Sequence, residues 1–584
     1  MESAPKKYII NEDFSSDSLN QLSWVTTFFT DTLHTFRWSG LSGMVLDHDA
    51  MSVIGFLPVF HADDDAVSGF AISVVRKDDT IPPPLFAIPV GIKVESGAER
   101  EPRDAGAIEA IFQFKNGIHA CARILINDMA FWKMLGRVLM SQSVPKKELI
   151  FDMLDPGFSI GIKSIGTLKD DDIDLLFLGG GDTTNIVIKF KMHANPGMDF
   201  VLKFYPRVAF NTSRFLNDML ASARFHKFAR LVATCDYTME TVQRFFHDSR
   251  SGAYFDQIAL SCAALNFPVN RFFPFIHFFQ FIPGNGDGGM PFWNSAVSPY
   301  QDEMNAPGND IVDITTRLGK TIAEFHQALR GKTVYFAENG AFQLQKLIRT
   351  VESQFRTIRA HLIEYQKILP KEYAEMISKL IQMLEFQEIS RKMIPDEAEY
   401  QRSACQYIHQ DLHMGQLMYI DALKEFYILD LEGDPQLPWN ERIEGSPIER
   451  DIASLVRSLS YIKITALRNR IEREFKDVVK MIPRFNEIYP LLFLASSGLV
   501  DYLYSLLEPT VMNALKKRVT VLNAWERNLH EIIIDSYAQE QPISKKNLLF
   551  FTLLRILNEI TYEIKFRPGN VFIPCVGLLE LIEK

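Results

Sequence analysis

Apolar residues recur along this chain with two different spacings, and the first part of the sequence contains both. Residues 20–38 carry apolar side chains at the three- and four-residue spacing of a helix, and Ser39-Gly40 then ends this pattern. Strand-like stretches and a second helix follow at Ser52–Phe60, Ala71–Val75, Pro84–Val94, Ala107–Phe114 and Asn127–Met140. We therefore predict a mixed α/β domain over residues 1–145.

The middle of the chain is predicted to be rich in strands. Leu175–Leu178 and Ile186–Phe190 flank a glycine-rich turn, and Asp199–Tyr205 is a third strand candidate. The apolar run that begins at His277 is a fourth, and it leads into a Pro/Gly loop. These elements place a second, strand-rich domain at residues 146–285.

Helical spacing dominates the rest of the chain, residues 286–584. The longest helix candidates are Asn309–Gly331, Asn339–Leu369 and Pro370–Arg391. Tyr489–Leu507 is the most apolar long run, but a proline, a glycine and a charged residue interrupt it. A membrane-spanning helix needs about 20 nearly uninterrupted apolar residues, so we interpret this run as a buried helix.

One hairpin interrupts the helical part. Leu417–Ile420 and Phe426–Leu431 read as two strands around a polar turn. A loop that carries Asp411 and Gln416 precedes this hairpin, and Asp430 lies at its far end. Because a hairpin brings its two ends together, we expect these three side chains to converge.

Composition and charge narrow the functional classes. The chain has 584 residues, which suggests two or three domains, and 47% of them are hydrophobic, which allows a large core. Its 62 basic and 72 acidic residues give a net charge of −10, which argues against broad nucleic-acid binding. The five scattered cysteines fit a reducing compartment, and the N-terminus shows no signal peptide. We expect a cytoplasmic protein that does not enter a membrane.

The loop and the hairpin carry residue types that phosphoryl transfer from Mg-ATP requires. Asp411 could accept the proton of an attacking hydroxyl, while Gln416 and Asp430 could hold the Mg²⁺ that bridges the phosphates. Glu432 is either a second magnesium contact or a turn residue. The spacing of these residues around a hairpin makes coincidence a poor explanation.

A lysine in the strand-rich domain also points to an anion. Lys203 lies in the strand DFVLKFY, where an unpaired charge would be costly to bury. The alternative is a solvent-facing lysine on an edge strand. The glycines of the turn before it, Gly180 and Gly181, with Thr183, could lay backbone N–H groups against phosphates, although an ordinary tight hairpin has the same composition.

The stretch from His409 to Asp430 resembles the catalytic loop of protein-kinase-like and aminoglycoside-phosphotransferase-like kinases. Those kinases have the pattern His-Gly-Asp-x-His-x-x-Asn, and Gln410 and Gln416 stand at its Gly and Asn places. With Gly-Gln before the hairpin and Asp-x-Glu-Gly-x-Pro after it, the stretch looks most like the maltokinases. That family phosphorylates maltose at its anomeric hydroxyl using ATP.

Further matches to maltokinases extend from residue 36 to residue 574. They comprise Phe36-Arg37-Trp38, Asn127-Asp128 with Phe131, Val201–Arg207 with Asn211, the loop after His277, LGKTIAEFHQAL with His326, the run from Ser446 to Tyr461, and Glu559, Tyr562, Glu563, Arg567 and Pro568. Two positions depart from the family: Phe215 stands where a glutamate would pair with the lysine, with Asp218 as a substitute, and Asn558 replaces a tyrosine.

The resemblance implies an α+β, bilobal protein-kinase-like fold: an N-terminal cap, a β-rich N-lobe and a large helical C-lobe. It assigns the ATP phosphates to Lys203 and the glycine-rich hairpin, and the adenine to the hinge backbone of Gln280, Phe281 and Ile282. It implies a structural role for His409, and a role for Asp451 in orienting the catalytic loop. The residues implied for the sugar are Arg450, Tyr562, Glu563 and Arg567, while His413 either touches substrate or orients the loop.

The implied function is an ATP- and Mg²⁺-dependent sugar kinase, most simply a maltokinase, acting as a monomer on a small-molecule sugar. Two alternatives stay open. One is a kinase of another sugar or amino sugar such as glucosamine, which Asn558 favours. The other is a catalytically weak kinase-like protein that acts as a binding partner, which Phe215 favours.

Overall fold

The structure is a computed structural model, and it describes the greater part of the chain. The described residues are 6–10, 12, 23–33, 51–63, 66–75, 85–95, 108–116, 118–140, 149–154, 173–178, 185–193, 198–248, 252–264, 266–284, 286–298, 307–331, 340–367, 377–378, 381–382, 389, 392–403, 405–434, 437, 439–480, 482, 484–494 and 504–582.

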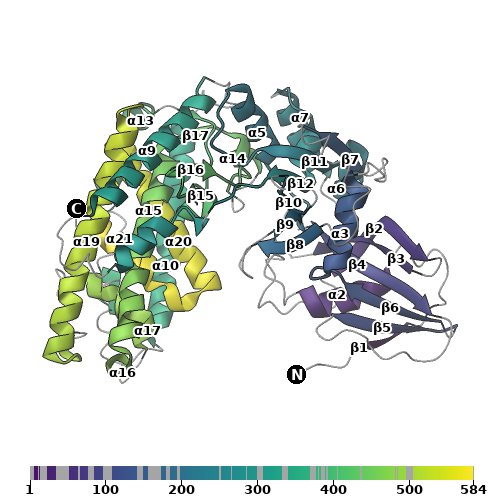
Figure 1. The fold of residues 1–584 in the computed structure, drawn as a ribbon, viewed down its shortest axis with the longest axis horizontal. Coiled ribbons are helices and arrows are strands. Elements are labelled where there is room, and N and C mark those ends of the chain that lie inside the picture. Colours follow the sequence, from purple (N-terminus) through teal and green to yellow (C-terminus); the bar gives the residue numbers. More distant parts are fainter. Residues whose placement is uncertain are drawn as a thin grey trace. The chain divides into compact units, whose positions relative to one another are not determined.

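The chain divides into two compact units. The first unit comprises Met1–Asn217 and Ala229–Phe281, and the second comprises Asp218–Phe228 and Ile282–Lys584. The first contains two large sheets, whereas the second is mostly helical, as the ribbon of each unit shows (Figure 1).

The first sheet of the first unit has six strands in the described part of the chain, in the order β1-β5-β6-β4-β3-β2. All its neighbouring strands are antiparallel except β1 and β5, which are parallel. The strands are β1 (Lys6–Ile10), β2 (Met51–Asp63), β3 (Ala66–Val75), β4 (Leu85–Glu95), β5 (Glu109–Phe114) and β6 (His119–Ile124). The helical elements that accompany them are η1 (Ser23–Val25), α2 (Thr26–Leu33) and α3 (Met129–Met140).

The second sheet of this unit is antiparallel throughout its described strands, in the order β7-β11-β12-β10-β9-β8. These strands are β7 (Leu149–Met153), β8 (Ile173–Leu178), β9 (Ile186–Met192), β10 (Phe200–Phe204), β11 (Leu231–Tyr237) and β12 (Pro274–Gln280). The helices between them are α5 (Ser213–Ser222), α6 (Met239–Asp248), α7 (Gly252–Ala264) and η5 (Val269–Phe272).

Aromatic side chains join the two sheets into one core. Phe70 on β3 packs against Phe204 on β10 and Phe275 on β12, with ring centroids 5.2 and 4.7 Å apart. Trp132 on α3 contacts the same Phe204 at 5.5 Å. The three phenylalanines and the tryptophan are completely buried, so the cap-like first sheet and the second sheet fold as one hydrophobic unit.

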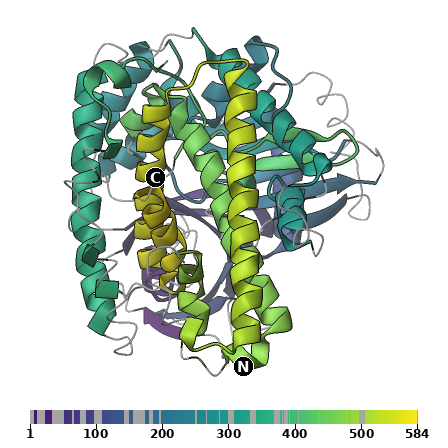
Figure 2. The same ribbon diagram turned by 90° about the vertical axis from the view of Figure 1, so that its left-hand side faces the viewer.

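The second unit is a helical assembly around α15 (Glu449–Glu474), which contacts α8, α19, α20 and α21. Figure 2 shows α19 and α20 running beside α15. The main helices are α8 (Met290–Val297), α9 (Asn309–Leu329), α10 (Gly340–Lys367), α19 (Pro509–Ala538), α20 (Lys545–Phe566) and α21 (Phe572–Ile582). Short elements are β13 (Gly286–Asp287), α13 (Glu397–Tyr400), β14 (Cys405–Gln406), η7 (Met414–Gln416), β15 (Leu417–Ile420), β16 (Glu425–Ile428), α14 (Trp439–Ile443), β17 (Ser446–Pro447), α16 (Lys476–Val479), α17 (Phe485–Ile488), η8 (Tyr489–Phe493) and η10 (Pro568–Asn570).

The predicted fold class is confirmed: this is an α+β, bilobal kinase-like fold. Along the chain, α5 follows β10, the strand that carries Lys203, and precedes β11. The hairpin predicted at residues 417–431 is present as β15 and β16. Of the apolar run from Tyr489, the described first part is a buried 3₁₀ helix rather than an α-helix. Residues 34–38 and most of the helix predicted at Pro370–Arg391 lie outside the described residues. No described helix is long and apolar enough to cross a membrane.

A glycine on α9 allows the close approach of α9 and α19. A Cβ atom at Gly319 would overlap Ser536 Oγ and would lie 2.8 Å from the Ile533 carbonyl oxygen. We predict that Gly319→Ala destabilises the second unit by about 1–3 kcal/mol, because the helices must separate to admit the methyl group. Thermal unfolding would measure the loss. Gly308→Ala is the control, since a methyl group at Gly308 would have nothing within 4 Å of it; equal melting temperatures for the two variants would contradict the prediction.

Candidate active site

The loop that carries Asp411 is held by one buried carboxylate. Asp451, in the first turn of α15, accepts hydrogen bonds from the backbone N–H groups of His409 at 2.7 Å and Gln410 at 2.8 Å. Its Oδ2 also lies 3.1 Å from Nε2 of the buried His326 on α9. These contacts agree with the expectation that Asp451 orients the catalytic loop.

His326 is in turn held by the helix that crosses α9. Its Nδ1 lies 2.7 Å from the hydroxyl of Tyr537 on α19, and its backbone carbonyl accepts a hydrogen bond from the side chain of Gln406. Helices α9, α15 and α19 thus meet at the base of the loop. His326 therefore has a structural position, because it is fully buried and both of its ring nitrogens have partners.

The loop needs two residues in the left-handed region of backbone space. Gln410 has a φ of +72° and Asp430 a φ of +56°, a region that costs most side chains energy. Gln410 is held there by its side-chain amide, which donates to the carbonyl oxygens of Glu441 and Arg442 at 3.1 Å each. Glycine, which stands at this place in the sequence pattern that the loop resembles, adopts this conformation without the steric cost of a side chain.

The hairpin brings Gln416 and the segment before Asp430 side by side. The backbone N–H of Leu429 donates to the Gln416 carbonyl at 2.8 Å, and Leu417 pairs with Ile428 across the hairpin. His409 Nε2 lies 2.8 Å from the Leu429 carbonyl, which ties the loop to the same strand end. The loop and the end of the hairpin therefore meet through hydrogen bonds to backbone carbonyls, while the convergence of the Asp411, Gln416 and Asp430 side chains stays a prediction.

An arginine from α20 contacts the predicted base. Arg555 Nη1 lies 2.8 Å from Asp411 Oδ1, and Arg555 Nε lies 3.2 Å from Glu559 Oε1 one turn later. The other oxygen of Glu559 binds Arg457 on α15 at 3.0 Å. Alternating charges thus link the catalytic loop to α20 and α15, and Gly577 on α21 leaves room for the Arg457 guanidinium, which a Cβ there would overlap.

This environment keeps Asp411 ionised. Burial would raise the pKa of Asp411, but Arg555 and then His413 outweigh it, so the net pKa of Asp411 lies below its ordinary value. Burial lowers the pKa of His413, although Asp411 and Asp430 oppose this. His413 Nδ1 accepts a hydrogen bond from the Gly415 N–H, so a neutral His413 carries its proton on Nε2, 3.9 Å from Asp411 Oδ2.

The residues predicted for the sugar fall into two places. Tyr562, Glu563 and Arg567 lie together at the end of α20, where the Arg567 guanidinium stands 5.5 Å from the Tyr562 ring. Glu563 is buried, accepts a hydrogen bond from the Tyr461 hydroxyl, and has its pKa raised by that burial. Arg450 is separate from this group and pairs with Asp434 at 3.4 Å.

The predicted nucleotide residues lie in or beside the first unit. Lys203 is buried on β10, directly opposite His277 on β12, so both side chains point to the same face of the sheet. Gln280 ends β12, and Phe281 and Ile282 follow it. Gly180, Gly181 and Thr183 lie outside the described residues.

Helix α5 carries an arginine network, and Phe215 stands where the resemblance to maltokinases implies a glutamate. Phe215 packs in the core against Phe267 and Phe272. Its neighbour Arg214 binds Asp236 at 2.7 Å and Asp152 at 2.8 Å. The cation is thus on the helix and the carboxylates are on the sheet.

Sequence reasoning missed Arg555 and Arg457 as parts of the site. Arg555 has a recognisable signal, because it and Glu559 form a charged pair four residues apart within the otherwise apolar run LLFFTLLRILNEI. The contact of Arg555 with Asp411 joins residues 144 positions apart and has no local signal.

Some known proteins resemble this chain at low sequence identity. No family model matches the chain. A stretch of 176 residues, 30% of this chain, is 23% identical to a glucosamine kinase of Mycolicibacterium smegmatis, and the match spans only 34% of that protein's length. Among solved structures, a glucosamine kinase in complex with glucosamine, ADP and inorganic phosphate aligns over 91% of this chain and 93% of its own, at 14% identity and a TM-score of 0.45. An ethanolamine kinase of Plasmodium vivax aligns over 73% and 87%, at 11% identity and a TM-score of 0.30.

Removal of the arginine should shift the pH dependence of any activity that uses Asp411. In Arg555→Gln, burial would no longer be opposed by the guanidinium, so the pKa of Asp411 rises and the carboxylate is protonated at higher pH. We predict that the acidic limb of the kcat/KM–pH profile moves to higher pH in this variant and stays near its original place in Arg555→Lys, which keeps the charge. A glutamine variant with an unmoved acidic limb would show that the ion pair does not set this pKa.

Proposed function

We propose that this protein is an ATP-dependent sugar kinase in which Asp411 is the catalytic base. The observation that carries the proposal is the pre-formed loop. The Asp451 contacts fix its backbone, and Arg555 keeps the Asp411 carboxylate ionised and oriented. A carboxylate held in this way can accept a proton from a hydroxyl without first rearranging.

The residues near Asp411 suit Mg²⁺. The donors that we propose, Gln416, Asp430 and Glu432, are an amide and two carboxylates, the oxygen ligands that magnesium takes in nucleotide-dependent enzymes. The 2.8 Å hydrogen bond between the backbones of Gln416 and Leu429 places Gln416 next to the residue that precedes Asp430. No group of three or more His, Cys, Asp or Glu side chains in the described residues forms a metal site by itself. Phosphate oxygens and water would therefore supply the remaining ligands, as is usual for magnesium.

The residues that we propose for the nucleotide belong to the first unit, except Ile282, which belongs to the second. We propose that Lys203 and the glycine-rich turn with Gly180, Gly181 and Thr183 contact the phosphates, and that the backbone of Gln280, Phe281 and Ile282 contacts the adenine. The burial of Lys203 in an apolar strand supports this role, because a buried ammonium is stabilised by a nearby anion. When bound, Mg²⁺ neutralises charge on the phosphates during transfer.

The reaction that follows is an in-line displacement. The sugar hydroxyl oxygen forms a bond to the γ-phosphorus while the bond from phosphorus to the β-phosphate oxygen breaks, releasing ADP. Asp411 receives the hydroxyl proton as the new bond forms. Arg555 keeps its contact with Oδ1, so Oδ2, on the side of His413, is the oxygen that we assign to the proton.

Maltose is the acceptor that we propose first. The sequence similarity to maltokinases covers the loop and the end of α20, where we assign Tyr562, Glu563 and Arg567, with His413 and Arg450, to the sugar. Glucosamine is the second candidate, favoured by the matched segment of a glucosamine kinase. Glu559 is shared between two arginines, which leaves Glu563 as the carboxylate better placed to meet an amine or a hydroxyl.

Loss of the base should abolish turnover while nucleotide binding remains. In Asp411→Asn the side chain keeps its size but can no longer take a proton, so we predict a fall in kcat of roughly 10²–10⁴. Calorimetry with Mg-ADP would show affinity within a few-fold of the wild type. Near-full activity in this variant would refute the assignment of Asp411.

An acceptor screen tests the function itself. ADP release would be measured with maltose, glucose, glucosamine and an aminoglycoside, and we expect turnover with maltose or glucosamine to exceed the others. Mg-ATP binding without turnover of any sugar would instead indicate a catalytically weak kinase-like binding protein.

A further inference from the structure

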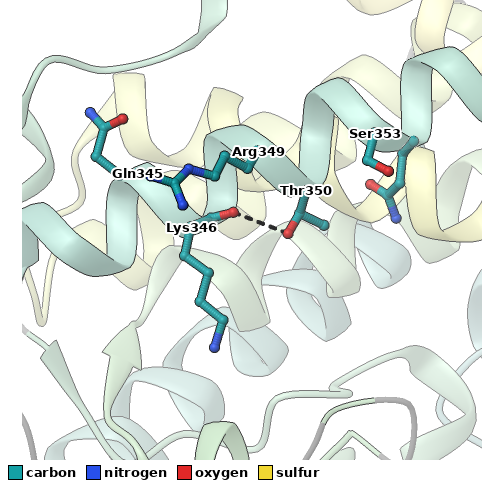
Figure 3. A pocket seen from close by; sticks show the side chains of 6 residues that line it. Gln345, Lys346, Arg349, Thr350 and Ser353 are labelled. Carbon is teal, nitrogen blue, oxygen red and sulfur yellow. Dashed lines mark hydrogen bonds between the residues drawn. The ribbon is translucent and has the colours of Figure 1, made fainter. Parts of the chain in front are cut away.

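The polar face of α10 borders a cavity, and none of its described lining residues is assigned above to ATP, Mg²⁺ or the sugar. The cavity measures about 480 Å³, within the range of small-molecule sites, roughly 300–1,000 Å³. Figure 3 shows five of the lining side chains following one another along α10: Gln345, Lys346, Arg349, Thr350 and Ser353. Gln354 also lines the cavity. The opposite side of α10, with Val351, Phe355 and Ile358, is buried in the core.

Both ends of this cavity touch elements that hold the catalytic base. At one end, Lys346 Nζ binds Glu441 Oε1 at 2.7 Å, and the carbonyl of Glu441 accepts a hydrogen bond from Gln410, the neighbour of Asp411. At the other end, Gln354 Nε2 donates to Asn558 Oδ1 at 2.5 Å. Asn558 follows Arg555 by three residues, so both lie on the same face of α20. These contacts link the cavity to the loop of Asp411 and to the face of α20 that carries Arg555.

Two of its side chains have hydrogen-bonding capacity left for a ligand. Gln354 Oε1 is buried and accepts no hydrogen bond from any residue that the structure describes, a state that costs about 1–3 kcal/mol until a donor arrives. Arg349 is exposed, and no described residue pairs with its guanidinium. Lys346 is already neutralised by Glu441, so the cavity does not concentrate positive charge. Its mixed amides and hydroxyls suit a neutral, hydroxyl-rich molecule.

We propose that the α10 cavity is a subsite for a second ring of the acceptor, which would make this enzyme prefer acceptors of two sugar rings over single sugars. A ring hydroxyl would donate to Gln354 Oε1, and Arg349 would donate to ring oxygens. From Lys346 to Gln354 the cavity runs about 12 Å along the helix, since each residue of an α-helix adds ~1.5 Å. This inference rests on the proposed sugar-kinase function and deepens it.

The test compares a two-ring and a one-ring acceptor. The ratio of kcat/KM for maltose to kcat/KM for glucosamine would be measured in the wild type, Arg349→Ala and Gln354→Ala. We expect the ratio to fall about tenfold in each variant, the size of one good hydrogen bond to a charged or buried group. Arg359→Ala is the matched control, because Arg359 is an exposed arginine on the same helix outside the cavity, and its ratio should stay at the wild-type value.

Several outcomes would overturn the inference. The inference is wrong if the ratio of kcat/KM for maltose to that for glucosamine is unchanged in both cavity variants. It is also wrong if the wild type phosphorylates glucosamine but not maltose, a result that would still support the kinase function. If the wild type phosphorylates none of the acceptors in the screen, the kinase function fails, and calorimetric titration with maltose then decides whether the subsite exists. Weaker maltose binding by Arg349→Ala than by Arg359→Ala supports the subsite, while equal or absent binding rejects it.

Discussion

The buried Asp451 carboxylate holds the catalytic loop in place, and much of the second unit is arranged around it. It is completely buried, as are His326 and Tyr537 behind it. Two backbone N–H groups and one imidazole share its oxygens, so the charge is stabilised by directed hydrogen bonds rather than by solvent. Because α9, α15 and α19 all contribute to this cluster, the loop geometry depends on the packing of three helices that are remote in sequence.

A second set of charges acts on the base from the other side. Arg555 and Glu559 lie on α20 and Arg457 on α15, so their positions are set by the contact of these two helices. An isolated buried ion pair often contributes little net stability, because desolvation offsets the attraction. Here the pair between Arg555 and Asp411 is partly exposed, and its main effect is on the protonation and orientation of the base.

Local patterns in the sequence were sufficient for most of the fold. The predicted strands and the hairpin have strong apolar alternation and clear turns, and the structure has strands at those places. Four further strands of the two large sheets, β1, β6, β7 and β11, were not predicted. The left-handed conformation of Gln410 could not be read from the sequence, because glutamine has no preference for it and only the Asp451 and Glu441 contacts impose it. The partner of Asp411 was missed for a similar reason, since helix packing alone brings α20 to the loop. The run Tyr489–Leu507 is predicted from the sequence to be a buried helix, and its described first part, η8, is buried and helical but has the tighter 3₁₀ turn.

The arginine on α5 has a consequence for how this protein could be controlled. A helix that lies next to a sheet can act as a switch between two states if it can move away from the sheet. Here Arg214 anchors α5 to β7 and β11 through Asp152, Thr234 and Asp236. Movement of α5 away from the sheet would leave the charges of Arg214 and its carboxylate partners buried and unpaired. Breaking such a buried pair costs about 3–5 kcal/mol. An effector could drive that motion only if its binding free energies for the two states differed by at least this cost. The Arg214 contacts therefore favour a fixed position of α5 on the sheet.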